Sequence, residues 1–132
     1  MKFLLDTDTC IYALKQNTTV LRNLLAQKRE DVMVSVITEA ELRTGAAKSA
    51  SAAKTLRLIE NFLRPLGILD FTSADAAVYA EVRASLERAA TPIGPLDTLI
   101  AAHAVARKLV LVSNNEREFN RVTGLQFQNW AY

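Results

Sequence analysis

Cysteine, histidine and glycine are scarce in this sequence, and each scarcity excludes a kind of chemistry. Cys10 is the only cysteine, so no disulfide can form within the chain, and a lone thiol fits a reducing compartment. His103 is the only histidine, which excludes catalysis by a pair of histidines and a zinc site rich in imidazole. The few glycines form neither a Walker A loop nor a dinucleotide-binding fingerprint. A small buried thiol and a helix-packed imidazole are the simplest interpretations of Cys10 and His103.

Long apolar runs are missing as well. After Lys2 the hydrophobic segment Phe3–Leu5 ends at Asp6, and this is too short for a secretory signal peptide. No stretch approaches the roughly 20 apolar residues that a membrane-spanning helix needs. We therefore expect a cytoplasmic protein with no membrane partner.

The residues that are present fit one folded domain over residues 1–132. Hydrophobic residues make up 50% of the chain and charged residues 23%, which is ordinary for a globular protein with a core. The formal net charge is +2, so nucleic acid is an allowed partner that charge alone does not indicate. Candidates for an RNA path, with ordinary surface charge as the alternative, are Arg43, Lys48, Arg83 and Arg88.

Four short apolar runs predict buried strands. They are rich in β-branched or bulky residues and do not alternate with polar ones, which is typical of parallel strands covered on both faces. The four runs are Phe3–Leu5, Val32–Val34, Ile68–Leu69 and Leu109–Val112. A fifth segment, residues 125–130, alternates apolar and polar residues and predicts a half-exposed edge strand.

Helical patterns fill the intervals between these strands. Within Ser73–Arg88, for example, Val78, Val82 and Leu86 recur every four residues. The other predicted helices are Thr9–Lys15, Thr18–Lys28, Thr38–Lys48, Ser51–Leu63 and Pro95–Arg107. This order predicts an α/β fold with a mostly parallel central sheet of about five strands, flanked by helices on both sides. Such sheets bind ligands at the carboxyl ends of their strands.

Acidic residues fall near that edge of the predicted sheet. Asp6 and Asp8 follow the first strand directly, and capping of the next helix is the simple explanation for them. An acid that closes a buried strand also lies where the sheet meets solvent, and this favours a functional role for Asp6.

Glu41 lies inside a predicted helix. Helical spacing puts it on one face with Ile37, Ala40 and Thr44, where a glutamate is costly to bury without a partner. The alternative is that Glu41 pairs with Lys48 or faces solvent.

Asp97 is the third residue of its predicted helix if Gly94 is the cap. It heads an apolar stripe that includes Ile100, Ala101 and Ala104, so it points toward the edge of the core. Favourable placement in the helix dipole is the alternative.

A polar segment, residues 113–119, follows the fourth strand and contains Asn115 and Glu118. Asparagine pairs are common in turns, and Glu118 also fits an ordinary surface charge.

These positions say more together than singly, because one parallel sheet can bring Asp6, Glu41, Asp97 and Asn115 to one pocket. Two carboxylates 4 Å apart repel by roughly 4 kcal/mol at an effective dielectric constant of 20. Such a cluster needs a cation or raised pKa values. Oxygen ligands without thiolates or several imidazoles select hard cations such as Mg²⁺ or Mn²⁺.

Four segments match a known family in the same order along the chain. Asp6-Thr7-Asp8 resembles the opening D-T-N or D-T-D of PIN domains. Residues 35–45, SVITEAELRTG, resemble the VapC stretch S-x-I-T-x-x-E-L-x-x-G. Residues 91–103, TPIGPLDTLIAAH, are similar to T-P-I-G-P-x-D-x-x-I-A-x-H, and residues 113–119, SNNEREF, to T-N-N-x-R-E-F. The chain thus resembles PIN-domain ribonucleases of the VapC toxin family from residue 1 to Trp130.

The resemblance implies a PIN fold and an endoribonuclease that hydrolyses RNA with a metal-activated water. It implies Asp6, Glu41 and Asp97 as the acidic cluster, with Asp6 and Asp97 the firmest ligands of Mg²⁺ or Mn²⁺. Glu41 is implied as a further ligand or as the base. Asn115 stands where many PIN domains have a fourth acid, and Glu118 is the alternative for that place.

The resemblance also implies partners. The RNA substrate is expected to be tRNA, with initiator tRNA as the particular candidate. A VapB-type antitoxin is expected to cover the acidic pocket with an arginine, and a second copy of the chain to form a homodimer. The apolar helices at 18–28 and 51–63 serve either an interface or the core.

Two other functions stay open. One is a non-catalytic binding module whose acids grip a cation or a basic peptide, and Asn115 in place of a fourth acid is its best support. The other is a DNA-directed nuclease or a DNA-binding regulator on the same fold.

Overall fold

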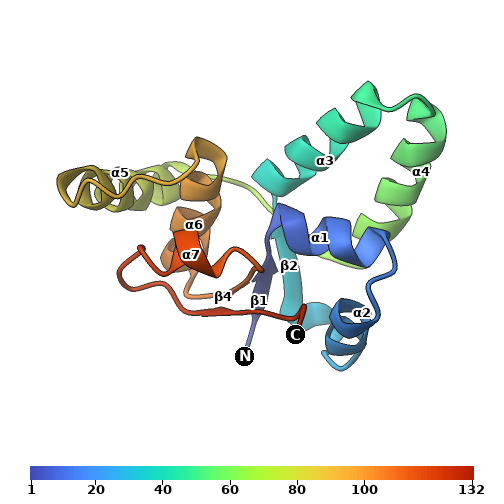
Figure 1. Ribbon diagram of the computed structural model, residues 1–132, viewed down its shortest axis with the longest axis horizontal. Coiled ribbons are helices and arrows are strands. Elements are labelled where there is room, and N and C mark those ends of the chain that lie inside the picture. The colour runs from blue at the N-terminus through green and yellow to red at the C-terminus, as the bar shows by residue number, and fades with distance from the viewer.

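The centre of the structure is a five-stranded sheet in which all paired strands are parallel (Figure 1). The computed structural model describes residues 1–132. Its strands are β1 (Phe3–Leu5), β2 (Val32–Ser35), β3 (Gly67–Leu69), β4 (Val110–Val112) and β5 (Phe127–Gln128), in the spatial order β3-β2-β1-β4-β5. The chain builds outward from β1 on one side and later returns to its other side. The carboxyl ends of β1 and β4 therefore flank the topological switch point, where such sheets bind ligands.

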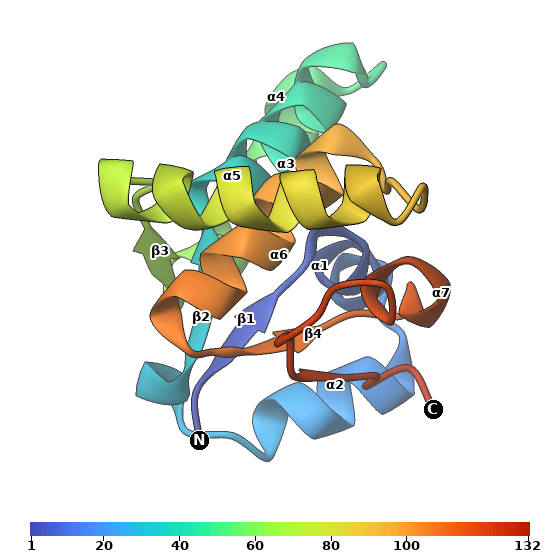
Figure 2. The ribbon, with the colours of Figure 1, turned by 90° about the vertical axis from the view of Figure 1, so that its left-hand side faces the viewer.

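Helices cover both faces of this sheet, as Figures 1 and 2 show. One face carries α1 (Thr7–Leu14), α2 (Thr18–Leu25), α3 (Val36–Lys48) and α4 (Ala52–Leu63). The other carries α5 (Ser73–Arg88), α6 (Pro95–Arg107) and the short α7 (Glu116–Phe119). A single 3₁₀ turn, Arg29–Asp31, leads into β2. None of the helices has the length and hydropathy to cross a membrane.

Two clusters of buried apolar side chains lie against the two faces because successive strand residues point to opposite sides. Phe3 and Leu5 of β1 belong to one cluster, together with residues of α1 to α4. Leu4 belongs to the other, together with residues of α5, α6 and α7. The prediction of short strands covered on both faces is confirmed for β1 and β4, in which every residue is buried.

The two edge strands depart from the predictions. The sequence predicts a buried strand at Ile68, and this is wrong: 40% of Ile68 is exposed, because β3 pairs only with β2 and forms one edge of the sheet. At the other edge, the strand predicted over residues 125–130 is confirmed only at Phe127–Gln128, which pair with β4.

Capping residues explain where the helix boundaries differ from the predicted ones. α1 begins at Thr7 because the Asp6 carboxylate accepts a hydrogen bond from the Thr9 backbone N–H. α3 begins at Val36 because the Ser35 hydroxyl caps it in the same way. The helices predicted at 73–88 and 95–107 have the observed bounds, with Pro95 at the first helical position. The four-residue helix α7 was missed, since the asparagine pair before it predicts only a turn.

Truncation of Leu4 tests the packing of the central strand. Leu4 is fully buried in β1, so Leu4→Ala should lower the free energy of unfolding by about 2–5 kcal/mol. The matched control is Leu58→Ala on α4, where the side chain is 54% exposed and the expected loss is within about 1 kcal/mol. Urea unfolding followed by circular dichroism measures both, and equal losses would contradict the burial described here.

Candidate active site

Asp6 lies at the carboxyl end of β1, beside the end of β4. Its backbone N–H donates to the Val112 carbonyl at 3.0 Å, and its side chain accepts from the Thr9 N–H at 2.8 Å. Only 2% of Asp6 is exposed. Burial raises the pKa of Asp6 to about 6, while hydrogen bonds from Ser113 and Thr9 act in the opposite direction. The predicted capping role is confirmed, and it leaves the same carboxylate beside the other acids of this edge.

Asp97 enters the same region from the first turn of α6. Gly94 is the N-cap residue and Pro95 follows it, so Asp97 is the third residue of the helix, as predicted. Its pKa is raised to about 7 by partial burial first, then by a hydrogen bond with Glu118 and by the charges of Glu118, Asp6 and Asp8. These acids therefore lie close enough to repel one another at neutral pH.

Glu118 is a further acidic neighbour of Asp97, and Asn115 is its hydrogen-bond partner. Glu118 belongs to α7, and its proximity contributes to the raised pKa of Asp97. The Asn115 amide Nδ2 donates to Glu118 Oε2 at 2.9 Å, and the Asn115 backbone N–H donates to Ser113 Oγ at 2.9 Å. Asn115 thus orients the carboxylate of Glu118 toward the site instead of supplying a charge itself.

Glu41 lies in the second turn of α3 and is linked by a hydrogen bond to Thr7, the residue after Asp6. The Thr7 hydroxyl donates to Glu41 Oε1 at 2.7 Å and lies 3.2 Å from the Thr38 hydroxyl. Glu41 is half-buried and forms no ion pair, so the alternative of pairing with Lys48 is wrong. Thr7 was not among the predicted site residues, although a hydroxyl between two acids in Asp6-Thr7-Asp8 was an available signal.

The charge of this site is uncompensated by protein cations. Asp6, Glu41, Asp97 and Glu118 all lack an ion pair with lysine, arginine or histidine. Their oxygen atoms are the donors that hard divalent cations prefer. No three acidic, histidine or cysteine side chains converge on a common point where they would together hold a metal ion. The donor chemistry therefore fits Mg²⁺ or Mn²⁺, and ligation by three carboxylates requires rotation of side chains.

Other polar residues of interest lie outside the site. Cys10 and His103 are fully buried, which confirms the simple interpretation of both. Arg43 pairs with Glu39 and Arg83 with Glu87 one turn away on their own helices, as surface charges commonly do. These two arginines therefore carry no argument for an RNA path.

Comparison with known proteins identifies the family. The model of the PIN domain family matches residues 3–125, so the chain belongs to the PIN-domain family. Within it the chain is a homologue of the VapC ribonucleases. It is 39% identical to the tRNA(fMet)-specific endonuclease VapC of Salmonella typhimurium over 131 residues, which are 99% of each chain. It is 41% identical to Ribonuclease VapC2 of Haemophilus influenzae over 131 residues, again 99% of each.

Solved structures agree with this assignment. VapBC2 from Rickettsia felis, bound to a promoter DNA fragment, contains a chain that matches with a TM-score of 0.94 and 36% identity, over 98% of this chain and 99% of that one. DNA-bound VapBC from Salmonella typhimurium matches with a TM-score of 0.93 and 39% identity, over 98% of both chains. The predicted α/β PIN fold is thereby confirmed.

The raised pKa values predict how stability changes with pH. The folded protein binds protons at Asp6 and Asp97 that the unfolded chain releases near pH 4, so the protein treated with EDTA should lose stability as pH rises from about 4 to 7. Asp97→Asn removes one of these charges and should be more stable than wild type at pH 8, with little difference at pH 4.5. Thermal unfolding at the two pH values measures this, and Asp31→Asn, in the 3₁₀ turn before β2, is the control. If the difference in thermal stability between wild type and Asp97→Asn were the same at both pH values, the electrostatic explanation would be contradicted.

Proposed function

We propose that this chain is a metal-dependent endoribonuclease, the cytoplasmic toxin of a VapBC pair, formed by one PIN domain over residues 1–132. The observation that carries the proposal is the group of Asp6, Asp97 and Glu118, which lies at the switch point of the sheet without a cationic partner. Homology to VapC ribonucleases over 99% of the chain supports the same reaction class.

Asp6 and Asp97 would hold the ion, with Glu41 and Glu118 as further oxygen ligands on either side. Bound Mg²⁺ or Mn²⁺ lowers the pKa of a coordinated water and offsets the negative charge that develops on the scissile phosphate. Hydrolysis of an RNA phosphodiester is the reaction that this combination serves best.

The protein side chains orient the reacting groups. Thr7 donates a hydrogen bond to Glu41 Oε1, which leaves Oε2 as the oxygen that would either bind the ion or act as the base. Asn115 holds Glu118 by a hydrogen bond, and the buried Ser113 hydroxyl lies close enough to Asp6 to lower its pKa. These hydrogen bonds keep the carboxylates in place despite their mutual repulsion.

The substrate we propose is tRNA, with initiator tRNA as the particular target. Support comes from relatives 38–39% identical that are named tRNA(fMet)-specific endonucleases. A DNA-directed activity is the alternative to be tested beside it, because VapBC relatives have been solved with bound DNA fragments.

Incubation of purified protein with total tRNA tests the activity. Wild type with Mn²⁺ should give discrete fragments, and EDTA should abolish them. Asp6→Ala and Asp97→Ala should each lower the cleavage rate by at least about 100-fold because both remove a ligand. Glu81→Gln, an exposed acid on α5, is the matched control and should cleave like wild type. Cleavage of a DNA strand but not of RNA, or full activity in either alanine variant, would contradict the proposal.

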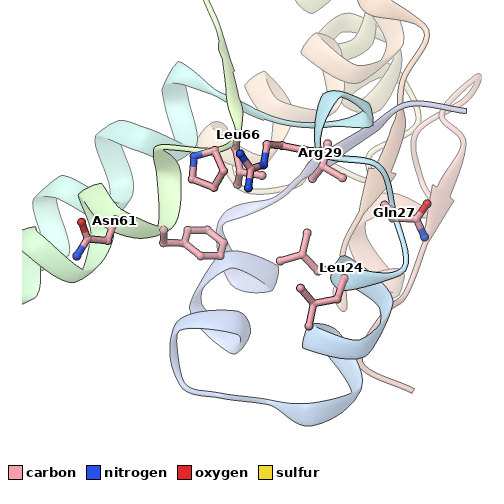
Figure 3. A pocket seen from close by; sticks show the side chains of 9 residues that line it. Leu24, Gln27, Arg29, Asn61 and Leu66 are labelled. Atoms are coloured by element: carbon pink, nitrogen blue, oxygen red, sulfur yellow. The ribbon is translucent and has the colours of Figure 1, made fainter.

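An apolar groove suggests where the antitoxin binds (Figure 3). It has a volume of about 390 Å³ and lies between the end of α2, the start of β2 and the end of α4. Its apolar lining includes Leu24, Leu25, Phe62 and Leu66, with Arg29 at its border. Leu25 is 82% exposed and adjoins the other apolar residues of the groove, and a contiguous apolar patch of this kind marks a binding surface. The predicted apolar helices 18–28 and 51–63 thus supply this groove as well as the core.

The occupant we propose is an amphipathic helix of a VapB-type antitoxin. Its apolar side chains would fill the groove and an acidic side chain would face Arg29, in the helix-in-groove mode of recognition. The groove lies at the amino end of β2, whereas the acids lie at the carboxyl ends of the strands. An antitoxin that reaches the acids with an arginine must therefore also extend past the helices that cover β2, over at least the length of this four-residue strand, which is about 13 Å.

A charged substitution in this groove tests whether antitoxin binding can be weakened without loss of RNA cleavage. Leu25→Glu should weaken binding of the co-expressed VapB antitoxin by about 10- to 100-fold, since it puts a charge where an apolar contact is expected, and should leave RNA cleavage intact. Leu58→Glu, an exposed leucine of α4 outside the groove, is the control. Titration calorimetry measures both affinities, and equal affinities would place the antitoxin elsewhere.

A further inference from the structure

Three fully buried polar side chains form a chain across the interior of the protein. Ser35 ends β2 and caps α3, His103 lies in the middle of α6, and Asp75 lies in the first turn of α5. Their exposed fractions are 0%, 0% and 1%. None of the three belongs to the candidate active site, yet α3 carries Glu41 and α6 carries Asp97.

The neighbours of Ser35 and His103 indicate which of their atoms donate and which accept hydrogen bonds. Ser35 Oγ accepts the Ile37 backbone N–H at 3.0 Å and lies 2.9 Å from His103 Nδ1. The anionic Asp75 carboxylate beside Nε2 favours the tautomer with the ring proton on Nε2, in which the Ser35 hydroxyl donates to Nδ1. Nδ1 is then the acceptor, and Nε2 carries the ring proton. Nε2 lies 3.6 Å from Asp75 Oδ2 and has no hydrogen-bond partner. Burial lowers the pKa of His103, so the ring is neutral at pH 7.

Asp75 is held rigidly at the far end of the chain. Arg107 donates to both of its oxygens at 3.0 Å, and the backbone N–H of Thr72 donates to Oδ2 at 2.8 Å. Arg107 also donates to the Asp70 carbonyl at 2.9 Å and holds the pKa of Asp75 well below its usual range. The carboxylate is thus a fixed anion that lies 3.6 Å from His103 Nε2.

Burial of the His103 imidazole costs more free energy than burial of an apolar side chain that fills the same volume. An unpartnered buried donor destabilises the folded protein, and an apolar side chain of similar size packed against Phe71 would avoid that cost. What the imidazole supplies that an apolar side chain cannot is a directed bond from α6 to the cap of α3.

We propose that His103 is a positioning residue that fixes α3 against α6 and thereby sets the separation of the Glu41 and Asp97 carboxylates. The inference rests on the proposed ribonuclease function for its consequence. Ser35 precedes Glu41 by six residues and His103 follows Asp97 by six, which is about 9 Å along each helix. A tilt of only 5° about this bond would move either acid by roughly 0.8 Å, and a displacement near 1 Å can lower a rate by about 100-fold.

Four variants test the proposal. His103→Leu removes the bond, His103→Asn keeps an acceptor near the place of Nδ1, and Ser35→Ala removes the donor with a smaller change of volume. Asn17→Ala is the matched control, because Asn17 caps α2 through the Val20 N–H at 3.0 Å and α2 carries none of the acids. For each variant we would measure kcat and KM on tRNA with Mn²⁺, thermal stability, and backbone amide chemical shifts without RNA.

His103→Leu and Ser35→Ala should lower kcat by about 10- to 100-fold with KM unchanged within about twofold, and His103→Asn should recover part of the loss. Amide shifts should change around both Glu41 and Asp97, and Asn17→Ala should lose stability alone. Ser35→Ala carries the test if His103→Leu does not fold. Unchanged kcat in folded variants, or shifts confined to the neighbours of the substituted residue, would overturn the proposal. A wild type inactive on RNA, with shifts at both acids in the variants, would overturn the ribonuclease function and leave the positioning role standing.

Discussion

Repulsion among carboxylates is the constraint on which the candidate site depends. Asp6, Asp97 and Glu118 come from a strand end and two helices, and only fixed backbone positions keep them together. The parallel register of β1 and β4 fixes the first of these positions. Leu5 lies opposite Val112, and this puts Asp6 level with Ser113. Hydrogen bonds from Thr9 to Asp6 and from Asn115 to Glu118 then hold two of the carboxylates in place.

Asp75, another buried acid, has a lowered pKa, whereas the pKa values of Asp6 and Asp97 are raised. Asp75 receives Arg107 as a partner, so its ionisation stabilises the folded protein above the pH at which the unfolded acid titrates, and this is lost as pH falls. Asp6 and Asp97 have no such partner, and their ionisation destabilises the protein as pH rises. One acid is thus compensated from within the chain, whereas the site retains negative charge for an external cation.

Local sequence patterns predicted much of this arrangement. β1, α5 and α6 follow from periodicity and helix-start residues, and Asp6 and Asp97 follow because they stand at the ends of those elements. Tertiary contacts decide the rest. The bond between Thr7 and Glu41 joins residues 34 positions apart, and that between Ser35 and His103 joins residues 68 positions apart. No local pattern encodes either contact, nor the exposure of Ile68, which depends on β3 ending the sheet.

Proton release on Mn²⁺ binding tests most directly the claim that the clustered acids await a cation. Calorimetric titration in two buffers of different ionisation enthalpy counts the protons displaced. With pKa values of about 6 for Asp6 and about 7 for Asp97, we predict release of about one proton at pH 6.5 and almost none at pH 8.5, with both binding and release reduced in Asp97→Asn. Absence of Mn²⁺ binding, or binding with no proton release at pH 6.5, would contradict the account.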